Sequence, residues 1–256
     1  MPLPLIFLGA AALGLVKRKE AKENFERAKH IGTRAEKAYQ KSEKNLQYMR
    51  DETNSILEEL GNLKIAIFNN QIKHLIEVIK KTKKSKSKLS GFNESISPIE
   101  LKEIETLILS TNVLSTNTNL AWVGAGALNA LGMMSGIVLA PALAVGGFMM
   151  ASKAEKALTE AIEYNADVDI AIAEMKRNEI ILQALQANAI EMGSTLIKLA
   201  ERFDEIKVNG NDDPESFERM IILGKGLKNL LDVAIMEKDG SATKNIKTKI
   251  SGYLEI

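Results

Sequence analysis

A charge-free stretch of forty-seven residues, from Thr106 to Ser152, constrains this chain more than any other feature. Its central part, residues 120–151, reads LAWVGAGALNALGMMSGIVLAPALAVGGFMMA and has only isolated polar positions. Core helices of globular proteins rarely continue this far without a solvated face, and about 18 successive apolar residues is the usual criterion for a membrane span. The stretch must therefore enter a bilayer or be covered by other helices.

The length and the small residues of this stretch favour a helical hairpin. One bilayer crossing takes about 20 residues, so residues 120–151 are too many for one span and too few for two. Small residues recur at every fourth position, and such ridges let helices approach closely in lipid. The alternative is a Gly- and Ala-rich hairpin buried inside a soluble bundle or oligomer. The predicted membrane-inserting residues are Trp122, Gly132, Gly136, Ala140, Pro141 and Ala144.

The first sixteen residues, MPLPLIFLGAAALGLV, also lack charged side chains, and Lys17, Arg18 and Lys19 follow them directly. A secretory signal places its basic residues before the apolar segment rather than after it. Three interpretations remain open: a short membrane anchor, an apolar plug in a bundle or oligomer contact, and an atypical cleaved signal.

Two other segments carry apolar and small residues at alternating steps of three and four. This spacing places them along one stripe of a helix, here called a seam, and its persistence over six or more heptads predicts two long helices with coiled-coil-like packing. The first seam is Phe25, Ala28, Gly32, Ala35, Tyr39, Ser42, Leu46, Met49, Thr53, Ile56, Leu60, Leu63 and Ile67. The second is Ala154, Ala157, Ala161, Tyr164, Val168, Ala171, Met175, Asn178, Leu182, Leu185, Ala189, Met192, Leu196, Leu199, Phe203 and Ile206.

The two long helices lie in regions of opposite charge. Residues 17–88 hold nineteen basic and ten acidic side chains, a net charge of +9, whereas residues 89–256 hold fifteen and twenty-three, a net charge of −8. Opposite charge favours pairing, and a hairpin closed by residues 80–150 is the simplest way to join the helices. The predicted fold is therefore all-α: an elongated antiparallel coiled-coil-like bundle with a Gly- and Ala-rich apolar hairpin.

Polar residues mark two special positions in these helices. Asn178 is the conspicuous polar residue of the second seam, and we expect it to fix the coiled-coil register against a polar group opposite. In the first helix the seam slips by one residue near Asn69 and Asn70, which indicates a kink or a change of partner face.

A lysine-rich segment follows the first long helix. Residues 80–88 hold six lysines and no acid. A solvated loop is one interpretation, and contact with an anionic surface is the other, because clustered lysines near an apolar segment attract anionic lipids. No aromatic side chain is interleaved to stack on bases, so we predict no nucleic-acid binding. The predicted anionic-surface contacts are Lys80, Lys81, Lys83, Lys84, Lys86 and Lys88.

These features divide the chain into five segments. After a turn, Asp213, Pro214 and Glu215 favour a further helix that begins at Pro214 and ends near Glu237. The predicted segments are an apolar N-terminal segment at 1–19, the first long helix with its lysine-rich loop at 20–88, the apolar helical hairpin at 89–152, the second long helix at 153–207, and the C-terminal helix and tail at 208–256.

Two long amphipathic helices on either side of a Gly- and Ala-rich apolar hairpin resemble the architecture of cytolysin A (haemolysin E) type α-helical pore-forming proteins. In that family an elongated bundle covers an apolar hairpin in the soluble form and releases it to build a ring of helices through a membrane. The resemblance covers roughly residues 20–207 and concerns layout, because no residue-level motif carries it. It implies that residues 120–151 are the membrane-active element.

The sequence offers little for catalysis. The absence of cysteine excludes disulfides and thiolate metal sites. No phosphate-binding G-x-x-x-x-G-K-[ST] motif occurs. His30 and His74 are far apart on one predicted helix, and the acids from Asp212 to Glu215 lack the spacing of a calcium loop. We predict no enzymatic activity, no cofactor and no metal site.

Together these features predict a bacterial-type membrane-active or membrane-anchored helical protein that oligomerises and forms pores through residues 120–151. Its partners would be an anionic lipid bilayer, further copies of itself and a protein partner. It would be membrane-associated, or soluble with conditional insertion. The alternative is a soluble structural or adaptor bundle whose apolar hairpin is an assembly or partner-binding core.

Overall fold

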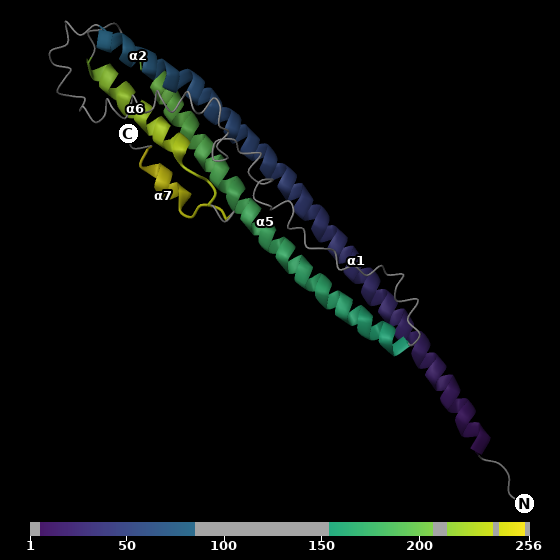
Figure 1. The fold of residues 1–256 in the computed structure, drawn as a ribbon. Coiled ribbons are helices and arrows are strands. Elements are labelled where there is room, and N and C mark those ends of the chain that lie inside the picture. The colour runs from purple at the N-terminus through teal and green to yellow at the C-terminus, as the bar shows by residue number, and fades with distance from the viewer. Residues whose placement is uncertain (1–5, 85–153, 207–213, 238–240, 254–256) are drawn as a thin grey trace, which may run out of the picture. The chain divides into compact units, whose positions relative to one another are not determined.

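The computed structural model describes residues 6–84, 154–206, 214–237 and 241–253 (Figure 1). Its elements in chain order are α1 (Ile6–Ile67), the π-helix η1 (Phe68–Ile72), α2 (Lys73–Lys84), α5 (Ala154–Asp204), α6 (Pro214–Asp232) and α7 (Ile246–Ser251). Within these ranges there is no β-strand, and Met236 and Ala242 form an isolated antiparallel bridge. The prediction of an all-α fold is confirmed.

The described residues belong to two compact units, which we describe separately. Unit 1 contains α1 as far as Met49 and α5 as far as Ile180. Unit 2 contains α1 from Arg50 onward, η1, α2, α5 from Ile181 onward, α6 and α7.

The core of unit 1 is one layer of seam residues from α1 and α5. The buried apolar residues are Ala28, Ala35, Tyr39 and Leu46 on α1, and Ala154, Ala157, Ala161, Tyr164, Val168, Ala171 and Met175 on α5. Alanine predominates, so the two tyrosines provide the largest side chains of this layer. Phe25 is 36% exposed, which means that the predicted seam is not covered at its first residue.

In unit 2, α1 and η1 run parallel to α5. Gln186 of α5 donates a hydrogen bond to Thr53 Oγ1 at 2.9 Å, and Gln71 of η1 donates one to Asp204 Oδ2 at 2.8 Å. Both bonds join residues 133 positions apart, so residue numbers rise together along the two helices. The antiparallel pairing predicted from sequence is therefore wrong for this unit.

The physical reason is that the net charge of a helix does not specify its direction. Opposite charge favours two helices lying side by side in either orientation, and only a short connection forces them to be antiparallel. Between Lys84, where α2 ends, and Ala154, where α5 begins, the chain is far longer than a helix-to-helix turn. A parallel pairing is therefore open to it.

Unit 2 differs from unit 1 in having a third helix in its core. Helix α6 contacts both η1 and α2. A Cβ added at Gly224 of α6 would meet the side chains of Leu75 and Phe203, so this glycine allows a close approach. Farther along α6, Leu231 lies beside Lys64 of α1. Residue numbers on α6 therefore fall as those on α1 and α2 rise, and α6 is antiparallel to them.

The ends of two helices differ from the sequence prediction. Helix α1 begins at Ile6, inside the predicted N-terminal segment, and α6 begins at Pro214 as expected but ends at Asp232 instead of near Glu237. Over the described ranges, no helix has both the length and the hydropathy needed to cross a bilayer. The predicted apolar hairpin lies outside these ranges.

Candidate functional site: buried polar residues of unit 2

The residues predicted for membrane insertion, Trp122, Gly132, Gly136, Ala140, Pro141 and Ala144, lie outside the described ranges. So do Lys86 and Lys88. Lys80 and Lys81 are exposed on α2, and Lys83 and Lys84 form its last turn. Asn178 is half-buried on α5 in unit 1. The structure does not gather the described members of this set into one site.

Lys64 of α1 is the most deeply buried charged residue in the part of the chain that the structure describes, with 1% of its surface exposed. Its Nζ donates hydrogen bonds to the main-chain oxygens of Leu231 at 3.0 Å and Val233 at 3.5 Å. The last carbonyl groups of a helix lack partners within the helix and carry partial negative charge. The ammonium therefore caps the C-terminal end of α6 from the side.

Burial determines the proton affinity of this lysine. Loss of hydration lowers the pKa of the Lys64 ammonium to about 8, and the negative charge of Asp232 partly opposes this shift. Asp232 also forms an ion pair with Lys228 at 3.2 Å. At neutral pH the ammonium is charged, and it loses its proton within a mildly alkaline range.

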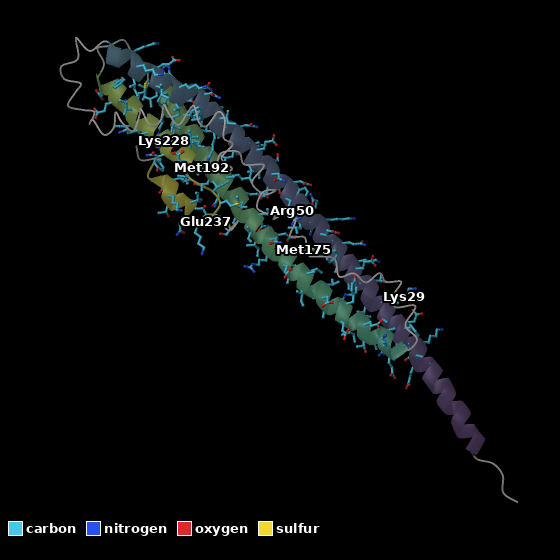
Figure 2. All side chains as sticks on the ribbon, in the orientation of Figure 1. Lys29, Arg50, Met175, Met192, Lys228 and Glu237 are labelled. Atoms are coloured by element: carbon cyan, nitrogen blue, oxygen red, sulfur yellow. The ribbon has the colours of Figure 1, made fainter. Side chains whose placement is uncertain are left out.

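The buried position of Lys64 follows from the drift of the α1 seam. An α-helix has about 3.6 residues per turn, so residues spaced by seven turn slowly around the helix axis. After about five heptads, the residue that faces a given direction lies one position later than a strict seven-residue repeat predicts. The predicted seam positions Met49, Ile56 and Leu63 are only half-buried. Their C-terminal neighbours Arg50, Leu57 and Lys64 are buried instead. The arginine is labelled in Figure 2.

Asn188 of α5 holds the chain that follows α6. Its Nδ2 donates to the main-chain oxygens of Ile235 at 3.2 Å and Thr243 at 2.9 Å. The same segment is closed on itself by main-chain bonds from Thr243 to Ile235 at 2.9 Å and from Glu237 to Ser241 at 2.8 Å. Asn188 thus fastens a small loop to α5, while Lys64 fastens the start of that loop to α1.

The π-helix brings polar and aromatic side chains to the other end of this site. Gln71 is buried in η1 and donates to Asp204, while its Oε1 lacks a hydrogen-bond partner. One turn later, the His74 ring meets the Phe203 ring edge to face with centroids 6.4 Å apart. π-Helical turns often mark functional positions, and this one supports a polar link between η1 and the last turn of α5.

These groups can hold a loop and respond to protonation. Lys64 donates to two main-chain carbonyl oxygens at the end of α6. Among the residues that the structure describes, no three His, Asp or Glu side chains come together in a way that could hold a metal ion. The arrangement is that of a buried polar clamp.

Sequence reasoning missed this clamp because neither Lys64 nor Asn188 belongs to a predicted seam. Both are polar, and both lie one step away from a seam residue. The sequence could have indicated Lys64, because Arg50, Leu57 and Lys64 recur every seven residues and so lie on one side of α1.

Comparison with known protein families, curated proteins and solved structures finds no match for this chain.

Proposed function

We propose that this protein is a membrane-active or membrane-anchored, oligomerising helical protein whose residues 120–151 enter the bilayer and form a pore. The single observation that carries the proposal is the charge-free stretch from Thr106 to Ser152. It lies between α2 and α5 in the sequence. It is the longest stretch of the sequence without a charged side chain, and it is long enough to enter hydrocarbon.

The described helices would act as the frame of this element. We propose that α1 and α5 pack as a coiled coil along their seams, with the apolar hairpin joined to the ends of that frame. The likeness in layout to cytolysin A type proteins supports this assignment, because in that family too a helical bundle carries an apolar hairpin that inserts into the membrane. Lys80 and Lys81, exposed on α2, would attract the frame to anionic headgroups before insertion.

Dye release from anionic liposomes tests the pore. The variant Gly136→Glu places a charge in the centre of the charge-free stretch, and we expect it to abolish release. The matched control is Gly252→Glu, because Gly252 is exposed and a Cβ there would touch nothing within 4 Å. Equal leakage from Gly136→Glu and the wild-type protein, or none from the wild-type protein at any concentration, would refute pore formation.

A second candidate function is a soluble adaptor or structural bundle in which residues 120–151 form an assembly or partner-binding core. Its support is the outward side of α5, where exposed isoleucines occur repeatedly and suit contact with protein. Carbonate extraction of cell membranes separates the two functions. A protein that leaves the membrane fraction with carbonate, and that protects residues 120–151 from hydrogen exchange without lipid, would be the adaptor.

A further inference from the structure

Helix α5 of unit 1 carries a second stripe of six residues, four of them apolar, on the side away from its buried seam. We call it the outer stripe; its members are Ile162, Ala166, Asp169, Ala173, Lys176 and Ile180. They follow one another at steps of 4, 3, 4, 3 and 4, the spacing of a coiled-coil contact. All six are exposed, and Ile162 and Ile180 expose 54% and 65% of their surface.

The outer stripe is unusual for the solvent face of a helix. An amphipathic helix normally places charged and polar residues opposite its core. In α5 the core side is already occupied, since Val168 and Met175 are fully buried, the latter labelled in Figure 2. Ile170, next to the outer stripe, is 61% exposed as well.

The exposed charges within the stripe and on its Ile170 side change sign along the helix, whereas Glu179, half-buried on the other side, is an acid in the second half. Glu163 and Asp169 lie in its first half, and Lys176 and Arg177 lie in its second half; all four are exposed. A second copy in parallel register would place acid beside acid and base beside base. A second copy in antiparallel register, centred near Ala171, would place Glu163 opposite Arg177 and Asp169 close to Lys176, twice over by symmetry.

We propose that the outer stripe is the contact surface of an antiparallel homodimer, in which α5 of one copy packs against α5 of a second copy. In this register Ile162 faces Ile180 of the other copy at both ends, and Ile170 meets its own counterpart at the two-fold axis. Ala166 and Ala173 lie opposite the charged residues of the stripe, and their small size leaves room for those longer side chains. The dimer is independent of membrane insertion.

Charge exchange gives the first test. Sedimentation of the full chain without detergent measures the dimer dissociation constant, which we expect to rise at least tenfold for Glu163→Arg or for Arg177→Glu. The double variant Glu163→Arg/Arg177→Glu restores the opposite charges, so its dissociation constant should return to within about threefold of the wild-type value. The matched control is Ile222→Ser, which removes a 42%-exposed isoleucine from α6 of unit 2 and should leave dimerisation unchanged.

Engineered cysteines test the direction, since the chain has none of its own. One variant carries Ile162→Cys and the other Ile180→Cys, with tags of different size. After mild oxidation, an antiparallel dimer yields the mixed disulfide, whereas a parallel dimer links each variant to itself. Circular dichroism confirms that each variant retains its helix content.

Three results overturn the proposal. The first is a wild-type protein that stays monomeric at all concentrations while the cysteine of the variant Ile170→Cys resists maleimide, because residues 85–153 of the same chain would then cover the stripe. The second is a monomer in which that cysteine reacts freely. The third is an oligomer whose size and affinity are unchanged by both single charge reversals, because another surface would then hold the copies together.

Discussion

Units 1 and 2 are built on the same two long helices, yet they bury different chemistry. Unit 1 packs a layer of alanines and two tyrosines between two helices. Unit 2 adds α6 and buries large apolar side chains together with Lys64, Arg50 and Gln71. A third helix supplies the enclosure and the free carbonyl groups that a buried ammonium needs. Among the described residues, the buried charged side chains Arg50 and Lys64 therefore both lie in the unit that has the third helix.

The two units also have opposite responses to alkaline pH. In unit 1, burial raises the pKa of the Tyr39 and Tyr164 hydroxyls, with smaller contributions from the nearby acids Glu43 and Glu36. The unfolded chain then releases these protons first, so unit 1 loses stability as the pH rises above 10. In unit 2, burial lowers the pKa of Lys64, so the folded state gains stability as the pH rises through that value.

Truncating the core of unit 2 should have the largest effect. We expect Phe203→Ala to lower the free energy of unfolding by about 3–5 kcal/mol, since Phe203 is 1% exposed and contacts both His74 and the site of closest approach at Gly224. Hydrogen exchange of each helix measures the effect by region. Equal loss of protection at Tyr39 and at Leu227 would show that the two units unfold as one, and would remove the basis for contrasting them.

The pH dependence of Lys64 comes next. Between pH 7 and pH 10 the unfolded chain keeps the Lys64 proton while the folded chain releases it, so the wild-type protein should gain about 2–3 kcal/mol of stability relative to Lys64→Met. Urea denaturation of both proteins across this range measures the difference. A constant difference at every pH would mean that Lys64 is hydrated in the folded protein.

Asn188 tests how far the clamp depends on side chains of α5. Asn188→Ala removes two hydrogen bonds and leaves the carbonyl groups of Ile235 and Thr243 without this donor, which should cost about 1–3 kcal/mol. The amides of residues 241–245 should exchange faster, while those of α5 in unit 1 stay unchanged. A matched substitution is Asn165→Ala, which removes an exposed bond to Asp169 at 2.9 Å. It should cost less than about 0.5 kcal/mol.

Two helical glycines give the smallest and sharpest test of packing density. At Gly193 an added Cβ would meet Leu63 at 3.7 Å, an ordinary contact, so Gly193→Ala should stabilise the protein by about 0.5–1 kcal/mol through its better helix propensity. At Gly224 the same methyl group would collide with the buried Leu75 side chain, so Gly224→Ala should destabilise by about 1–2 kcal/mol. Thermal melting of both variants measures the two signs.

Much of the helical architecture could be predicted from the sequence. The second seam is buried at nearly every predicted position, and Asn178 and Ile206 are half-buried exceptions. The one-residue slip near Asn69 and Asn70 coincides with η1, where a π-helical turn holds one residue more than an α-helical turn. Heptad spacing is a local property, and a local property can be read from a single sequence.

Helix direction and the buried polar clamp could not be predicted in the same way. Direction depends on which ends of two distant helices meet, and neither seam spacing nor net charge encodes it. The burial of Lys64 depends on α6 ending beside it, so two segments separated by 167 residues determine one pKa. Enclosure by a third helix is a tertiary property. The drift of the α1 seam turns Lys64 inward, but the sequence of α1 does not show that α6 ends there.

The π-helical turn also has a genetic consequence. Because η1 holds one residue more than an α-helical turn, the gene could lose a single codon there and still encode an unbroken helix. That deletion would turn every residue of α2 by about 100° around the helix axis. Lys73, Glu77 and Lys80 would then take the buried positions of Ile72, Ile76 and Ile79. The one extra residue in η1 therefore keeps the apolar residues of α2 on the buried side of that helix.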